Sequence, residues 1–398
     1  MVSQRRDAAI VGIYEYPKRK APGVTPLQIK AECAARALED AGLSWKDVDG
    51  LYDAQDGAGM SGLSLSEYFG FRPNVIDTTA VGGSSYEFQA AHARRAIAAG
   101  KCKVALLTYG STAHSDSRRI GTGGGMGGPG AASPMSNMQD SYGMTLIANY
   151  AMVAHRHMHQ YGTTSEQLAR IASVTRAHAM RNPDAVQAME DLEFQGINEI
   201  TVQDVMNSRM IADPLHLLDC CMVSDGGGAV VIASPDVVRD TKKKPVWIIG
   251  TGEATKYSEN GGDLTVSAGA QSAPPAFDEA GITPREIDIA MIYDSFTITV
   301  MVLLEDLGFC KKGEGGAFVE GERLHHKSPL KPAINTDGGG LSSNHPGMRG
   351  IFLLLEAARQ LRGESTSQVD GARLAVAHGN GGMLATSHTG GTIILAGD

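Results

Sequence analysis

The stretch ALEDAGLSWKDVDGLYD, Ala37 to Asp53, decides the fold because a second copy of it occurs later in the chain. The later copy is AFDEAGITPREIDIAMIYD, Ala276 to Asp294, and its Ala280–Gly281 pair matches Ala41–Gly42. Each copy has the pattern of an apolar-periodic helix that ends at Ala-Gly, followed by a short turn and a strand. A repeat of this kind predicts two halves with the same internal structure.

The similarity extends outward from both copies. AIVGI (Ala9 to Ile13) matches WIIGT (Trp247 to Thr251), and both halves end with a buried helix, a glycine and an apolar strand. Strands that alternate with helices predict a mainly parallel sheet covered on both faces. We therefore expect one half over residues 1–235, with an inserted loop domain at about 111–213, and a second half over residues 245–398.

Composition excludes several classes of protein. The 398 residues carry a net charge of −9, which argues against a nucleic-acid-binding surface. The five cysteines form no C-x-x-C pair, so neither a disulfide framework nor a zinc site is indicated. The apolar run that follows Arg5 and Arg6 is too short for a membrane span. We expect a cytoplasmic protein with no membrane span and no bound metal.

Four segments, three of which contain glycine, follow predicted strands or begin predicted helices. They are VGGSS (Val81 to Ser85), IYDSF (Ile292 to Phe296), NTDGGGLSSNHPGMRG (Asn335 to Gly350) and VAHGNGGM (Val376 to Met383). Open α/β sheets bind ligands at the carboxyl ends of their strands. We expect these four segments to converge on one site.

These segments resemble the motifs of the thiolase superfamily, in the order that the family has them. GGGLSSNHPGMRG is similar to the thiolase G-G-x-x-x-x-G-H-P-x-G loop, with His345 at the catalytic histidine. HGNGGM is similar to the C-x-G-G-G loop with His378 at the cysteine, and YDSF to N-E-A-F with Tyr293 at the asparagine. The resemblance implies an α/β thiolase fold, with two pseudo-symmetric mixed-sheet halves in an α/β/α/β/α layering and an inserted loop domain. It also implies a homodimer.

The departures from the family concern its catalytic groups. The nucleophilic cysteine of thiolases falls on Gly83 in this sequence, with Ser85 at the serine of the same motif. Gly83 has no side chain, so we expect open space and backbone N–H groups where a thiolate would stand. Ser84 and Ser85 could replace the nucleophile only if a base lay within reach.

The remaining groups can stabilise a negative charge. The start of the helix near Ser84, the amides near Asn380 and Gly381, and His345 could together surround an oxyanion. Such a site suits retro-aldol cleavage of a β-hydroxyacyl-CoA, which passes through a thioester enolate. Tyr293 is the candidate base, and its phenol needs a nearby histidine or helix dipole to lower its pKa.

This pattern is similar to the thiolase-like aldolases of the lipid-transfer-protein type that act in steroid side-chain degradation. The resemblance implies an acyl-CoA substrate, no covalently bound cofactor, and a small partner with a zinc ribbon and an OB-fold. The second tyrosine of those aldolases falls where this chain has Ser343 and Asn344. The candidates are Tyr293, His345 and His378 for catalysis, the backbone of Gly83, Ser84, Asn380 and Gly381 for the oxyanion, and Ser85, Asp294, Ser343 and Asn344 for substrate binding.

Two alternatives stay open at this point. The chain could be an acetyl-CoA acetyltransferase or another Claisen-type thiolase that uses a different nucleophile. It could also be a non-catalytic carrier of acyl-CoA or lipid. For Asp294 and Asn335, a second interpretation is that their side chains fix loops by accepting backbone N–H groups.

Overall fold

The computed structural model describes residues 6–54, 60–116, 142, 145–194, 196–257, 262–384 and 387–398. The main strands of the first half are β1 (Ala9–Glu15), β2 (Gly50–Asp53), β3 (Val75–Asp77), β4 (Val104–Ser111) and β7 (Gly226–Ala233). Those of the second half are β8 (Val246–Lys256), β9 (Ile289–Ile292), β10 (Ala333–Ile334), β11 (Leu374–Met383) and β12 (Ser387–Ala396). Together they form one ten-stranded sheet in the order β10-β9-β11-β12-β8-β1-β7-β4-β2-β3.

The repeat is visible in this strand order. Counted outward from the centre, the first half reads β1, β7, β4, β2, β3, and the second reads β8, β12, β11, β9, β10. The halves join where β1 and β8 pair antiparallel, with Ala9 opposite Trp247. Each half therefore has the same strand order as the other, which confirms the predicted pseudo-symmetry.

The strand directions differ from the prediction of a mainly parallel sheet. Among the strands described, β2 pairs parallel with β3 and β4, and β9 pairs parallel with β10 and β11. The other five pairings of this sheet are antiparallel. The connection from β11 to β12 is too short to hold a crossover helix, so β12 must run antiparallel to β11. β7 is the equivalent of β12 in the first half. The sheet is mixed, as the family resemblance implied.

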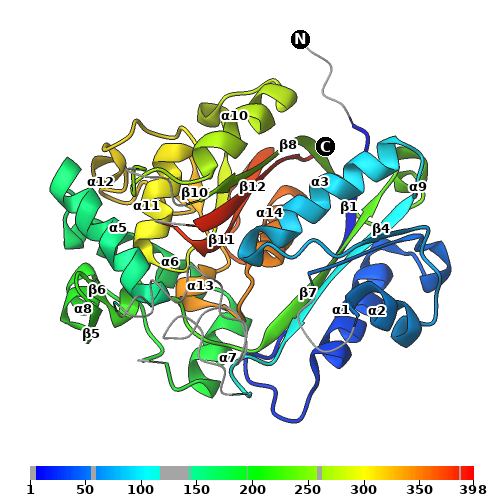
Figure 1. Cartoon of the computed structure of the whole chain (residues 1–398), viewed down its shortest axis with the longest axis horizontal. Helices are drawn as coiled ribbons and strands as arrows, with labels where there is room; N and C mark the ends of the chain where they lie inside the picture. The colour runs from blue at the N-terminus through cyan, green and yellow to red at the C-terminus, as the bar shows by residue number, and fades with distance from the viewer. Residues whose placement is uncertain are drawn as a thin grey trace.

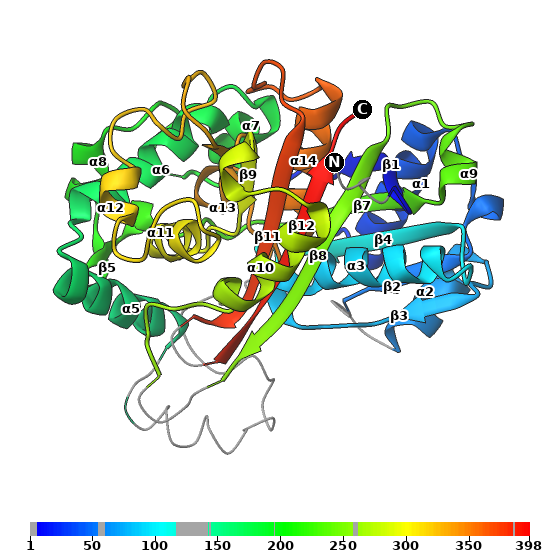
Figure 2. The same ribbon diagram turned by 90° about the horizontal axis from the view of Figure 1, so that it is seen from above.

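Helices divide the molecule into layers (Figures 1 and 2). α1 (Pro26–Ala41) covers β1, β4 and β7 on one outer face, and α10 (Gly269–Ala280) covers β8 and β12 on the other. α3 (Ser85–Ala98) and α14 (Gly350–Arg362) lie side by side and contact strands of both halves. Nearly every residue of α14 is buried, as a middle layer requires. The predicted α/β/α/β/α layering is confirmed.

The segment between β4 and β7 contains a group of helices. These are α5 (Leu146–Tyr161), α6 (Ser165–Ala179), α7 (Pro183–Asp191) and α8 (Val202–Asn207), followed by a small sheet of β5 (Met210–Ala212) and β6 (Leu215–His216). The glycine-rich part of the predicted inserted domain falls at residues 117–141 and lies outside the described residues. α5 and α6 pack against α11 (Thr297–Asp306), and α6 also packs against α13 (Gly339–Ser342). This places the helices beside the loops that carry the motifs.

Four shorter helices complete the described part of the chain: α2 (Ser61–Phe69), α9 (Pro235–Val238), α12 (Gly315–Phe318) and the already named α13. Among the helices of the described part, none is both long enough and apolar enough to cross a membrane.

A charged contact ties the two halves together at α3. His92 contacts Asp77 at the end of β3 through Nδ1 at 2.5 Å, and Glu253 of β8 through Nε2 at 3.3 Å. The hydrogen bonds to Asp77 and Glu253 raise the pKa of His92 to about 9, against the lowering effect of partial burial.

The stability of the protein should therefore depend on pH through His92. An unfolded histidine loses its proton near pH 6.5, whereas folded His92 keeps its proton to about pH 9. The stabilisation by His92 is therefore complete below pH 6.5 and is lost as the pH rises through 9. We expect the unfolding free energy to fall between those values by roughly 2 kcal/mol more in the wild type than in His92→Gln. Urea denaturation at several pH values measures this difference. Equal pH slopes for the two proteins would show that the contact contributes nothing.

Candidate active site

The four predicted segments meet in the structure. Gly83 lies in a 3-10 turn (Gly82–Ser84) before α3, Tyr293 directly follows β9, Asn380 lies in β11, and His345 lies between α13 and α14. A side chain built on Gly83 would meet the ring of Tyr293 and the carbonyl oxygen of Asn380. The rings of Tyr293 and His345 pack edge to face, with centroids 5.5 Å apart. The predicted convergence is therefore found.

The position of the missing nucleophile is filled. A Cβ atom on Gly83 would lie closer to the ring of Tyr293 than real Cβ contacts do. The expectation that Gly83 leaves open space is wrong, because the Tyr293 ring occupies that space. Tyr293 is thus both the residue at the family's asparagine position and the group that replaces the volume of the cysteine side chain.

The phenol of Tyr293 is buried and its hydroxyl is bonded to the loop after His345. The hydroxyl donates to the carbonyl of Gly347 at 3.3 Å and accepts the backbone N–H of Arg349 at 3.4 Å. Burial raises the pKa of Tyr293 well above 10, and Arg349 offsets only part of this. As the base, Tyr293 needs a nearby histidine or helix dipole to lower this pKa, whereas the net shift in the structure is upward. The phenol therefore keeps its proton at neutral pH.

The two predicted catalytic histidines, His345 and His378, are neutral. His345 is 3% exposed, and neither of its ring nitrogens has a hydrogen-bond partner among the described residues. Burial, followed by the charge of Arg349, lowers the pKa of His345 to about 4. Nδ1 of His378 is hydrogen-bonded to Oγ1 of Thr392 at 2.9 Å, and its Nε2 has no partner among the described residues. Burial lowers the pKa of His378 to about 3. Both rings can donate or accept a hydrogen bond without carrying charge.

One buried arginine connects the loops that carry these groups. The guanidinium of Arg349 bonds to Asp294 at 3.0 Å, to Asp337 at 2.6 and 2.8 Å, and to the side-chain oxygen of Asn344 at 2.7 Å. Asp294 adjoins Tyr293, and Asn344 adjoins His345. The amide of Asn344 in turn donates to Glu15 at 2.6 Å. Arg349 therefore sets the relative positions of the tyrosine and the histidine.

Asp294 and Asn335 both accept backbone N–H groups. Asp294 accepts from Gly340 at 2.8 Å and from Leu341 at 3.3 Å, and burial raises its pKa to about 6 despite the charge of Arg349. Asn335 accepts from Ile292 at 2.9 Å and has a left-handed backbone conformation, with φ of 42°. These bonds agree with the loop-fixing interpretation of both side chains.

The serines at the start of α3 are engaged within the turn. Ser84 shares a 2.6 Å hydrogen bond with Thr389, and Ser85 donates to the carbonyl of Gly82 at 2.6 Å while accepting the N–H of Val81 at 2.9 Å. Within the ranges that the structure describes, no hydrogen bond joins either hydroxyl to a histidine. Neither serine therefore has the base that a nucleophile requires. Ser343 differs from them, since its buried hydroxyl has no partner in the described part of the chain.

α5 also brings Tyr150 to the site, through a contact with Asn380. Its hydroxyl accepts the side-chain N–H of Asn380 at 3.0 Å and donates to the carbonyl of Gly382 at 3.0 Å. Its ring lies 4.5 Å from that of Phe296, the last residue of the YDSF motif. Burial raises the pKa of Tyr150 to about 12. No family motif covers residue 150, so its place in the site could not be predicted from the sequence.

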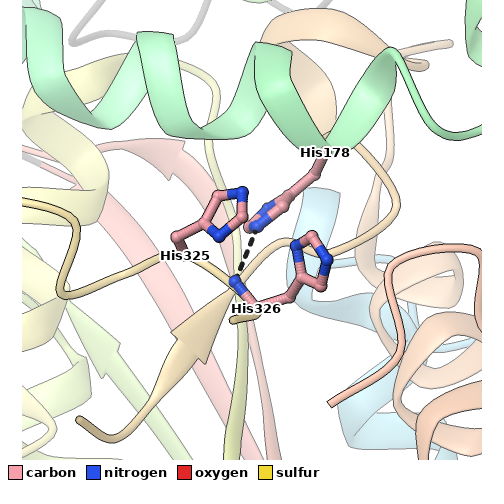
Figure 3. A group of neighbouring side chains, drawn as sticks. All are labelled: His178, His325 and His326. Carbon is pink, nitrogen blue, oxygen red and sulfur yellow. Dashed lines mark hydrogen bonds between the residues drawn. The ribbon is translucent and has the colours of Figure 1, made fainter. Parts of the chain in front are cut away.

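Three histidines gather beside the site loops at the end of α6 (Figure 3). The backbone N–H of His326 donates to Nε2 of His178 at 3.0 Å, and the rings of His325 and His326 lie 4.3 Å apart at their centroids. Burial lowers the pKa of all three. Metal-bound histidines usually donate through the second ring nitrogen, whereas Nε2 of His178 accepts here. The hydrogen bond from His326 to His178 holds the 325–326 turn on α6. That the protein binds no metal stays a prediction.

Comparison with known proteins agrees with this architecture. Residues 250–396 match the thiolase C-terminal domain-like family. The chain is 33% identical over 397 residues to an acetyl-CoA acetyltransferase of Methanothermobacter thermautotrophicus, with 97% of this chain and 98% of the relative covered. It is 33% identical over 378 residues to a steroid side-chain-cleaving aldolase of Thermomonospora curvata, with 91% and 92% covered.

A solved structure described as the Ltp2-ChsH2(DUF35) aldolase superposes with a TM-score of 0.87 at 29% identity, covering 99% of each chain. The relatives thus include a transferase and aldolases. Because a third of the residues are identical over nearly the whole length of both chains, and the sheet and loops have the arrangement described above, this chain belongs to the thiolase superfamily.

Proposed function

We propose that this protein is an aldolase that cleaves a β-hydroxyacyl-CoA by a retro-aldol reaction, releasing a ketone or aldehyde and a short acyl-CoA. The observation that carries the proposal is the Tyr293 ring in the volume that a side chain at Gly83 would need. A covalent acyl-enzyme has no nucleophile at this position. A buried phenol and a neutral imidazole remain there, and these groups suit proton transfer and enolate stabilisation.

In the proposed reaction, Tyr293 as the phenolate takes the proton of the β-hydroxyl group. The Cα–Cβ bond breaks, the β-carbon becomes a carbonyl, and the electron pair forms the thioester enolate. His345 donates a hydrogen bond to the enolate oxygen, and the backbone N–H groups at Gly83, Ser84 and Gly381 are further candidate donors. One donor of this kind typically stabilises the transition state by about 3–4 kcal/mol.

The substrate class and the partner are parts of the proposal that rest on relatives. The Thermomonospora curvata relative is described as steroid side-chain-cleaving, and we propose a steroid-derived acyl-CoA as the substrate. The superposed aldolase is described together with a DUF35 protein, and we propose that this chain also works with a small zinc-ribbon and OB-fold partner. Coenzyme A enters as part of the substrate, and the protein acts as a homodimer.

An acyltransferase is the second candidate, and the identity with the Methanothermobacter thermautotrophicus acetyltransferase favours it. A single assay separates the candidates. The full chain, alone and co-expressed with a DUF35 protein of the same genome, receives 3-hydroxy-3-methylbutanoyl-CoA or a steroid β-hydroxyacyl-CoA. A parallel reaction receives acetoacetyl-CoA plus free CoA, and mass spectrometry follows the products.

Ketone release without added CoA supports the aldolase. CoA-dependent cleavage of acetoacetyl-CoA overturns it in favour of the acyltransferase. Binding of both acyl-CoAs without turnover overturns it in favour of a carrier.

The raised pKa of Tyr293 predicts the pH dependence of cleavage. A phenol that ionises well above pH 10 supplies more phenolate with every unit of pH, so kcat should rise about tenfold per unit with no plateau between about pH 6 and 10. Tyr293→Phe should lower kcat by roughly 10²–10⁴-fold with little change in KM. Stopped-flow or discontinuous assays across this range measure the profile. A profile that is flat from about pH 5 upward would instead identify His345, with its pKa of about 4, as the base.

The steric relation between residues 83 and 293 predicts a second result. Gly83→Ala should lower the free energy of unfolding by about 1–3 kcal/mol, because the added methyl group overlaps the Tyr293 ring. In a Tyr293→Ala background the same change should cost less, since the ring is gone and only the overlap with the carbonyl oxygen of Asn380 remains. Urea denaturation of the four proteins of this double-mutant cycle measures the coupling. An equal loss in both backgrounds would mean that the overlap which matters is with the Asn380 carbonyl and not with the Tyr293 ring.

A further inference from the structure

The proposed reaction needs a proton donor as well as a base. After the Cα–Cβ bond breaks, the enolate must receive a proton at its α-carbon before the short acyl-CoA leaves. His345 and His378 have pKa values of about 4 and 3, so neither holds an imidazolium proton at neutral pH. Tyr293 already accepts the proton of the β-hydroxyl group. A separate acid in the site would deliver this proton without passing it back through Tyr293, and this inference rests on the proposed function.

We propose that Tyr150 of α5 is the acid that protonates the α-carbon of the enolate. Asn380 connects the phenol of Tyr150 to the position of the missing nucleophile, because it contacts both. The carbonyl oxygen of Asn380 lies against Gly83, and its side-chain N–H donates to the hydroxyl of Tyr150 at 3.0 Å. Tyr150 therefore lies one residue away from the place where a thiolase nucleophile would act.

The YDSF motif brings Tyr150 and Tyr293 to the same site. The Tyr150 ring packs on Phe296 at 4.5 Å, three residues after Tyr293 in the same loop. The two phenols are near enough to influence each other electrostatically, and each is fully enclosed by protein. Asn380 donates to an oxygen lone pair of Tyr150, and the hydroxyl hydrogen points to the carbonyl of Gly382 at 3.0 Å, so it must leave that carbonyl to reach the α-carbon.

Protons and electrons balance without a further reactant. Tyr293 takes the β-hydroxyl proton, and the electron pair of the broken C–C bond becomes the enolate. Tyr150 gives its O–H proton to the α-carbon, a C–H bond forms, and Tyr150 is left as a phenolate. The proton held by Tyr293 then returns to Tyr150, so that each turnover moves one proton from the β-hydroxyl to the α-carbon.

Other acids beside the loops are less suited to this step. Tyr109 donates to the carbonyl of Pro346 at 2.8 Å and accepts the N–H of Met348 at 2.9 Å, so it holds the loop after His345. The Cys221 thiol is the rival donor, because it lies near enough to both site tyrosines to raise their pKa values. Burial also raises the pKa of Cys221 well above 9, and the test includes a variant of this residue.

Exchange of the α-hydrogens of acetyl-CoA in D₂O tests Tyr150 without any C–C cleavage. By microscopic reversibility, the group that delivers the α-proton also removes it in the reverse step. We expect Tyr150→Phe to slow exchange at least about 100-fold and to leave the Kd for acetyl-CoA within about threefold. Tyr293→Phe should block cleavage of 3-hydroxy-3-methylbutanoyl-CoA and leave exchange intact. Tyr86→Phe is the matched control, because this buried tyrosine also donates to a backbone carbonyl, that of Thr108 at 3.3 Å.

The outcomes separate this inference from the proposed function. Wild-type exchange in Tyr150→Phe, together with cleavage by the wild type, overturns the role of Tyr150 and leaves the aldolase standing. Loss of exchange in Cys221→Ser with retention in Tyr150→Phe transfers the role to Cys221. A wild type that neither exchanges nor cleaves overturns both proposals. If Tyr150→Phe fails to fold, 3-fluorotyrosine at residue 150 keeps the ring and hydroxyl, and an unchanged pH profile of exchange would then overturn the role.

Discussion

The buried guanidinium of Arg349 is the interaction on which the active site depends. It neutralises Asp294 and Asp337, and it also binds Asn344. These partners belong to three loops that come from different parts of the second half. Removing one partner of a buried ion pair typically destabilises a protein by about 3–5 kcal/mol, because the other charge stays buried. The positions of Tyr293 and His345 are thus coupled, since one charge holds both loops.

The same charge also affects the chemistry of the site. Arg349 adds to the effect of burial in keeping His345 unprotonated, and it lowers the pKa of Tyr293 without overcoming burial. In the proposed reaction the Tyr293 phenolate loses its negative charge when it takes the β-hydroxyl proton, and that charge moves to the enolate. The negative charge of the enolate then meets hydrogen-bond donors that are already in place, which is the condition for electrostatic catalysis.

Much of the fold could be predicted because it follows from local patterns that occur twice. The repeat at Ala37 and Ala276 predicted two equivalent halves, and the order of the strands in the sheet repeats accordingly. The direction of β12 could not be read from the alternation of strands and helices, since it depends on one short connection. In the site, the motifs located His345 and Tyr293. They could not show that the Tyr293 ring fills the space at Gly83, or that α5 contributes Tyr150, because both facts depend on packing between distant segments.

The exchange of volume between residues 83 and 293 also restricts the order in which one chemistry could replace the other. A tyrosine at 293 with a side chain still present at 83 would overlap it. In the opposite order, the glycine comes first and the tyrosine later, and the intermediate protein has only a small cavity beside residue 83. A cavity the size of a methyl group costs about 1 kcal/mol of stability. An ancestor would therefore have lost its nucleophile before it gained the phenol. Its first step would have been an inactive or binding protein, from which a new reaction could develop.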